Sequence, residues 1–149
     1  MRNLIKNSCW RLGEDNRPRY FSSEGVSFRG CLEQFRVGDA GQECGESHVQ
    51  YDPLIPVTPG ECIIWGIMIR AMYADEVMLR AEFYDIHGEV IRVEDRDITC
   101  SISNDFQRTE GMYTAPAQAV HVRLSIHLCG MIRWLEMYNP IACSGWGMR

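Results

Sequence analysis

The sequence lacks the features that mark several large classes of protein. No apolar run approaches the roughly 20 residues that a membrane-spanning helix needs, and the longest, residues 62–69, has only the length of a strand. Basic residues are neither clustered nor in excess, because 15 Lys and Arg face 20 Asp and Glu and the net charge is −5. We therefore expect no membrane insertion and no nucleic-acid partner held by a basic surface.

Catalytic motifs are also missing. The chain contains no Gly-x-Ser-x-Gly, no phosphate-binding glycine loop and no His-Glu-x-x-His. His121 and His127 are separated by six positions, about 20 Å along a strand, so they cannot hold one metal ion together. The acidic run Glu94–Asp97 is typical of a solvated loop or edge, and not of two carboxylates facing across a cleft. The sequence predicts a protein that is not an enzyme.

Cysteine pairing patterns are absent, although cysteine itself is not. The chain has seven cysteines, an odd number, with no Cys-x-x-Cys and no spacing suited to zinc. This favours buried thiols in a reducing setting over a disulfide framework, and cross-links between chains of an assembled layer are the alternative. The first residues do not form a signal peptide. The location is left open: a cell or spore surface, or the extracellular space, would require a larger or differently exported chain.

What the sequence does contain is alternation. Residues 118–128 place apolar side chains on one side of a strand, and the other side carries Ala119, His121, Arg123, Ser125 and His127. Successive side chains of a strand point to opposite faces, so this strand has one apolar and one polar face. Residues 77–83 repeat the pattern, with Val77, Leu79, Ala81 and Phe83 on one side.

Strand and turn signals together define the expected fold. Glu61–Tyr73 is expected to be one long central strand, preceded by a Pro59-Gly60 turn, and Asp85–Gly88 is expected to close a hairpin. Further strands are expected at 4–7, 19–22, 26–31, 33–37, 47–51, 107–113 and 131–138. We predict an all-β, antiparallel jelly-roll-like β-sandwich of about eight to ten strands. Residues 1–141 form the single domain, and residues 142–149 form a short C-terminal tail, with truncation from a longer chain left open.

Several short motifs occur in a recognisable order along nearly the whole chain. They are Asn3-Leu4-Ile5-Lys6-Asn7, Thr58-Pro59-Gly60-Glu61, Tyr84-Asp85-Ile86-His87-Gly88, Ala115-Pro116-Ala117-Gln118-Ala119 and Trp134-Leu135-Glu136-Met137. In this order the chain resembles the jelly-roll sandwiches of carbohydrate-binding modules, in the broad galactose-binding-like superfamily. The resemblance implies that a glycan chain binds on a concave sheet face. It also implies a structural calcium site, for which Glu136 is the one side-chain ligand carried over; no other cofactor is expected.

The polar sheet face is the main candidate site. If residues 61–73, 77–86 and 118–128 share one sheet, their outward side chains form a patch of arginine guanidinium groups, carboxylates and an aromatic ring. The charged groups can hydrogen-bond to sugar hydroxyls, and the aromatic ring can pack against the C–H side of a sugar ring. The predicted ligand-binding residues are Arg70, Arg80, Glu82, Tyr84, His121, Arg123, Ser125 and His127, joined by His48 and Gln50. The alternative is a solvated outer face with cross-strand charge pairs, which any sandwich has.

Aromatic residues near loops are a second candidate. Trp10 is predicted to stack on the ligand, and Trp146 is a further residue to test. Trp65, Phe83, Trp134 and Phe106 are more simply explained as core residues, because aromatic side chains dominate core burial.

The sequence thus favours a non-catalytic module that binds a glycan or glycoconjugate. The alternative is a structural domain that assembles into a homo-oligomer, in a surface or spore-coat-like layer. The odd number of cysteines and the tail after Cys143 favour that alternative.

Overall fold

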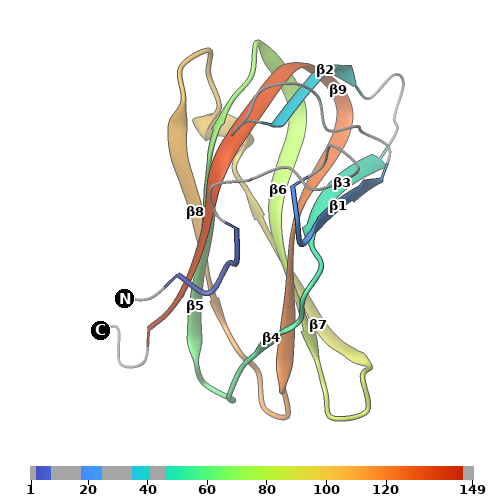
Figure 1. Cartoon of the computed structure of the whole chain (residues 1–149), viewed down its shortest axis with the longest axis vertical. Helices are drawn as coiled ribbons and strands as arrows, with labels where there is room; N and C mark the ends of the chain where they lie inside the picture. The colour runs from blue at the N-terminus through green and yellow to red at the C-terminus, as the bar shows by residue number, and fades with distance from the viewer. Residues whose placement is uncertain (1–2, 8–17, 25–34, 41–45, 146–149) are drawn as a thin grey trace.

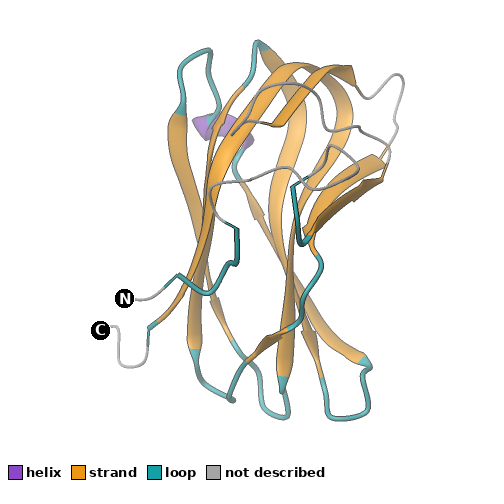
Figure 2. Cartoon of the chain, viewed as in Figure 1, coloured by secondary structure: helices purple, strands orange, loops and turns teal. Residues whose placement is uncertain are grey.

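The described part of the chain folds into an antiparallel sandwich of nine strands, as predicted (Figure 1, Figure 2). The computed structural model describes residues 3–7, 18–24, 35–40 and 46–145, with the backbone alone for 35–40. The strands are β1 (Phe21–Glu24), β2 (Phe35–Ala40), β3 (Glu46–Tyr51), β4 (Ile55–Pro56), β5 (Cys62–Arg70), β6 (Tyr73–Tyr84), β7 (Val90–Asp97), β8 (Gln107–Thr114) and β9 (His121–Ser144), with one 3-10 turn, η1 (Thr99–Ser101).

Strand β9 belongs to both layers of the sandwich. Its residues 121–129 pair with β3 and β6, and its residues 132–144 pair mainly with β2 and β5. Figure 1 shows β9 rising in one layer and crossing over the top into the other. One layer, called the β6 layer below, therefore has the order β1-β3-β9-β6-β7. The other, the β5 layer, consists of β2, the second half of β9, β5 and β8.

The core lies between these layers and is built from the alternating residues. Val77, Leu79, Ala81 and Phe83 are completely buried, as the alternation predicts, and the apolar side of β9 packs beside them. Two hydrogen bonds cross the core. Trp65 Nε1 of β5 donates to the carbonyl of Ser125 over 3.4 Å, and the Tyr113 hydroxyl of β8 donates to the carbonyl of Leu79 over 2.5 Å. These bonds tie the β5 layer to the two central strands of the β6 layer, β9 and β6, across the core.

The expected long strand Glu61–Tyr73 is wrong. Strand β5 ends at Arg70, the chain turns at Ala71 and Met72, and Tyr73 opens β6 with 50% of its surface exposed. Strand β5 then pairs with β8 and β9 and not with β6. The expectation that residues 61–73 add their outward side chains to the face of residues 77–86 and 118–128 is therefore also wrong.

The opening and the end of β9 also differ from expectation. Gln118 has a φ of 73° and Ala119 lies in a buried turn, so regular pairing starts only at His121. The separate strand expected at 131–138 is the continuation of the same strand. Ala142, where the tail was expected to start, is fully buried and still within β9.

The smaller expectations have mixed outcomes. The Asp85–Gly88 loop closes the β6–β7 hairpin, where the Asp85 amide donates to the Glu89 carbonyl and Gly88 has a φ of 77°. Residues 4–7 form no strand, and the expected strand at 26–31 lies outside the described residues. Cys62, Cys100, Cys129 and Cys143, the cysteines that the structure describes, are free thiols. Nowhere in the described chain is a helix long and apolar enough to cross a bilayer.

Candidate functional site: the polar face of the β6 layer

Side chains of five neighbouring strands meet on the outer face of the β6 layer. Residues opposite each other in an antiparallel ladder point to the same side, so the register defines rows across the sheet. We call this surface the polar face. Its rows are Glu24–His48–His127–Met78–Asp97, Ser22–Gln50–Ser125–Arg80–Asp95, Arg123–Glu82–Val93 and Pro56–His121–Tyr84.

Two histidine rings stack in the first row. The rings of His48 and His127 lie 5.2 Å apart at 23°, and His127 Nε2 is 3.0 Å from Ser125 Oγ. Burial lowers the pKa of His127 to about 4, with further lowering from the positive charges of Arg80 and His48. At neutral pH the His127 imidazole is thus uncharged, and a neutral imidazole offers one donor and one acceptor.

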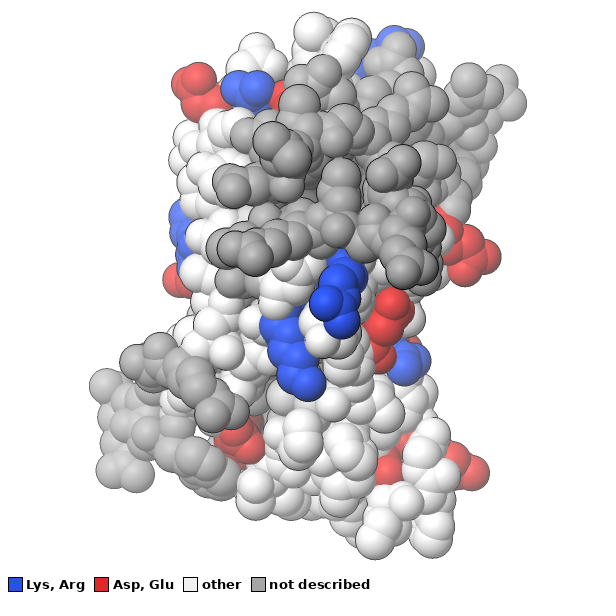
Figure 3. Space-filling model, in the orientation of Figure 1, with Lys and Arg blue, Asp and Glu red and all other residues white. Residues whose placement is uncertain are grey.

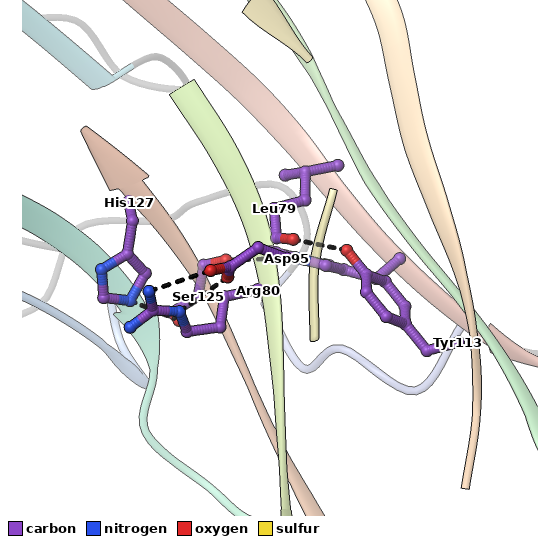
Figure 4. A network of polar contacts seen from close by, with 7 residues as sticks. Leu79, Arg80, Asp95, Tyr113, Ser125 and His127 are labelled. Carbon is purple, nitrogen blue, oxygen red and sulfur yellow. Dashed lines mark hydrogen bonds and ion pairs between the residues drawn. The ribbon is translucent and has the colours of Figure 1, made fainter. Parts of the chain in front are cut away.

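Arg80 is fixed in the second row by a two-pronged ion pair. Its Nε and Nη2 donate to the two carboxylate oxygens of Asp95 over 2.7 and 3.1 Å, and this bond raises the pKa of Arg80. Figure 4 shows the guanidinium reaching Asp95 while it lies beside the pair formed by His127 and Ser125. Ser125 is only 1% exposed, so its neighbours cover it. Two charge-assisted hydrogen bonds therefore hold Arg80 and Asp95 in one arrangement within this row.

Arg123 in the third row has hydrogen-bonding capacity left over. Its Nη1 donates to the Tyr84 hydroxyl over 3.2 Å, and its guanidinium lies 5.5 Å from the centre of the Tyr84 ring. Its Nε is buried and makes no hydrogen bond within the structure. Glu82 stands opposite Arg123 in the ladder. A buried donor of this kind costs free energy unless an acceptor reaches it.

The far corner of the face is organised by Asp52. Its Oδ1 accepts from Ser22 Oγ over 2.5 Å and from Gln50 Nε2 over 3.1 Å. On the side of the molecule seen in Figure 3, acidic and basic side chains are interspersed and form no patch of one sign. The polar face itself also carries both signs, with Arg80 and Arg123 among Glu82, Asp95 and Asp97, so it suits a neutral polyhydroxylated ligand better than a polyanion.

The structure brings most of the predicted site residues together. Arg80, Glu82, Tyr84, His121, Arg123, Ser125 and His127 share the face with His48 and Gln50. Arg70 does not join them, because β5 lies in the other layer; grouping it with this patch was wrong. Trp10 lies outside the described residues. Ser22, Asp52 and Asp95, which the structure also places on the polar face, were not among the predicted residues.

Glu136 does not fit the calcium site that the resemblance implies. Its Oε1 accepts from Arg70 Nε over 3.0 Å and from Nη2 over 2.7 Å, so a guanidinium is already bound to it. Calcium requires six to eight oxygen ligands. No group of three or more His, Cys, Asp or Glu residues within the described part of the chain is placed to hold a metal ion.

Comparisons with known proteins support the fold. No protein-family model and no curated protein matches the sequence. Among solved structures, a CBM4 module has a TM-score of 0.59 at 12% identity, covering 88% of this chain and 99% of that chain. A family 16 carbohydrate-binding module has a TM-score of 0.58 at 14% identity, covering 95% and 99%. The chain thus has the jelly-roll architecture of carbohydrate-binding modules.

Larger proteins contain the same architecture as one part. The enzymatically active domain of tailspike protein 4 from bacteriophage CBA120 matches with a TM-score of 0.66 at 11% identity. The match covers 96% of this chain but only 21% of that one, so the chain spans about a fifth of its length.

Proposed function

We propose that the chain is a non-catalytic module that binds a neutral glycan on the polar face. The observation that carries the proposal is the third row, where Tyr84 holds the Arg123 guanidinium through Nη1, Nη2 makes no hydrogen bond within the described structure, and Glu82 lies opposite. A sugar hydroxyl on the outer face can accept a hydrogen bond from Arg123 Nη2. Glu82, opposite Arg123, is placed to accept a hydrogen bond from a neighbouring hydroxyl.

The rest of the face suits a chain of sugars lying across the strands. Arg80 and Asp95 are tied to each other, as are Ser22, Gln50 and Asp52, so few side chains lose freedom when a ligand binds. The uncharged His127 ring can donate or accept. Asp95 is committed to Arg80, which favours holding a ligand over acid–base chemistry.

The structural neighbours support the proposal by their names and their extent. The CBM4 and family 16 modules are matched over 99% of their own lengths, so the likeness is to complete binding modules. A cellulose-binding domain from Cellulomonas fimi is matched over 99% of its length as well. Contacts of this kind give modest affinity, which several modules in one protein would raise together.

A glycan array followed by calorimetry tests the proposal. For the glycan that binds best, we expect Arg123→Ala to weaken affinity by about tenfold or more, because it removes a charged donor. Arg108→Ala is the matched control, because Arg108 is an exposed arginine on β8 in the other layer, and affinity should stay unchanged.

Two outcomes would contradict the proposal. One is an array that stays blank for folded protein; the other is equal loss of affinity in both variants. A stable oligomer that buries Arg80 and Arg123 would instead support the alternative, a self-assembling structural domain.

A further inference from the structure

Two adjoining cavities lie at one end of the sandwich, away from the polar face. They open where β5 turns into β6, at the top of Figure 1, and have volumes of about 360 and 230 Å³. The larger is lined by Ala71, Met72, Tyr73, Ala74, Thr99, Ile102, Ser103 and Asn104. The smaller is lined by Arg70, Ala71, Met72, Asn104, Trp134 and Glu136. Together they have the size of a small-molecule site.

The walls present large apolar side chains to solvent. Met72 lines both cavities and is 62% exposed, and Tyr73 and Trp134 are each 50% exposed. Aromatic rings that stay half exposed next to a cavity offer flat faces to a ligand. Tyr73 is further oriented by its hydroxyl, which donates to Asp75 Oδ1 over 2.5 Å.

The backbone places Trp134 at this position against its own preference. Trp134 has a φ of 54°, a left-handed conformation that costs a residue with a side chain about 1–2 kcal/mol. It sits at a bulge, because β9 has one residue more than β2 between the pairs Arg133–Asp39 and Leu135–Gly38. Bulges commonly re-aim a side chain next to a functional site. Strained residues of this kind cluster at ligand sites, and Trp134 keeps half of its surface exposed at this one.

Polar groups line the same space. In the smaller cavity, Arg70 is held by an ion pair with Glu136, a residue that is only 6% exposed. The guanidinium carbon of Arg70 lies 4.4 Å from the centre of the Phe106 ring. Its Nη1 is not used in that ion pair. Asn104 lines both cavities, and its amide supplies both donors and an acceptor. A fixed cation and an amide can bond to sugar hydroxyls, and an aromatic face can pack against the apolar side of a sugar ring.

We propose that this end of the sandwich is a second binding site, which takes one sugar residue, either a monosaccharide or the end of a glycan. The ring stacks on Trp134 or Tyr73 and its hydroxyls bond to Asn104 and Arg70. The site shares no residue with the polar face, so a substitution in one site leaves the side chains of the other in place.

Titration of the folded protein with simple methyl glycosides, followed by NMR, tests this site. The probes are methyl β-D-glucopyranoside, β-D-galactopyranoside and β-D-xylopyranoside, and methyl α-L-arabinofuranoside. We expect at least one of them to shift the indole N–H signal of Trp134 in a saturable way. Trp65, which is buried and bonded to Ser125, is the internal control and should not shift. Trp134→Phe identifies the signal.

Variants separate this site from the polar face. We expect Asn104→Ala and Trp134→Ala to weaken glycoside binding by about tenfold or more, with Trp134→Phe weakening it less because it keeps an aromatic face. Arg123→Ala should leave glycoside binding unchanged, and Trp134→Ala should leave binding of the array ligand unchanged. Failure of one site therefore does not imply failure of the other.

Three results would overturn the proposal. The Trp134 signal could stay still with every glycoside in folded protein. Arg123→Ala could abolish glycoside binding, which would place the ligand on the polar face. The Trp134 signal could shift with protein concentration in the absence of sugar, which would mean that a second copy of the chain covers this end.

Discussion

The two halves of β9 contribute to the molecule in opposite ways. From His121 to Cys129 the strand is regular, and its register with β3 and β6 sets every side chain on one face or the other. Beyond this, positive φ angles at Gly130, Trp134 and Asn139 bend the strand into the second layer. The regular half produces a broad face of aligned rows, and the bent half contributes to a cavity. One strand thus supplies two surfaces of different shape, one by pairing and one by interrupting the pairing.

The largest expected difference between the halves is in stability. Leu124→Ala removes a fully buried side chain from the regular half and should lower the free energy of unfolding by about 2–5 kcal/mol. Trp134→Ala removes a larger side chain from the bent half, but one that is half exposed, and should cost less than about 1.5 kcal/mol. Urea denaturation measures both. Equal losses would show that the Trp134 side chain is part of the core.

Acid should weaken the regular half through His127. Its pKa of about 4 lies below the value of about 6.5 expected in the unfolded chain, so the unfolded state binds more protons between these values. The stabilising contribution of the neutral ring is therefore complete above about pH 6.5 and is lost as the pH falls toward 4. Because the ring is partly solvated, we expect the free energy of unfolding to fall by roughly 1–2 kcal/mol, which is less than the pKa shift of His127 would give in full.

Unfolding free energies at neutral and acid pH check this prediction. His127→Gln should lose stability less steeply than the wild type as the pH falls. His87→Gln, in the exposed β6–β7 loop, is the matched control and should follow the wild type. The charged and titratable neighbours of His127 are Arg80, Asp95 and His48. The prediction is contradicted if His127→Gln is as sensitive to acid as the wild type.

The smallest predicted effect is the difference in stability between glycine and alanine variants, which should have opposite signs in the two halves of β9. At Trp134, glycine should be more stable than alanine by about 0.5–1 kcal/mol, because only glycine adopts a positive φ without cost. At Arg123, in regular strand, glycine should be less stable than alanine by about the same amount. Both comparisons use truncated side chains, so they report on the backbone. The same sign at both positions would mean that Trp134 is not strained in solution.

What the sequence could predict follows the same division. Alternation in 77–83 and 121–128 is a local property, so it predicted the buried side and the polar side of the two central strands. Trp134 was interpreted as core, because a tryptophan carries no signal for the positive φ that turns it outward. The turn at Ala71 and Met72 was missed because neither residue is a turn former.

Arg70 and Asp95 were misplaced or missed because strand pairing, which no local pattern reveals, determines where they lie. Arg70 was grouped with the polar face because nothing local reveals that β9 changes layers and that β5 follows its second half. Asp95 was missed because a register shift between Phe83 and Tyr84 places it, and not Glu94, opposite Arg80. A bulge of one residue moves every later side chain of the strand to the opposite face of the sheet, and no local sequence pattern predicts where it occurs.

Mapping of backbone amide shifts on binding of the best glycan from the array is the most direct test of the polar face. We expect the largest changes in residues 46–50, 78–84 and 121–127, the strands that carry the central rows. Changes confined to β5 and β8, with the polar face unmoved at saturating ligand, would contradict it.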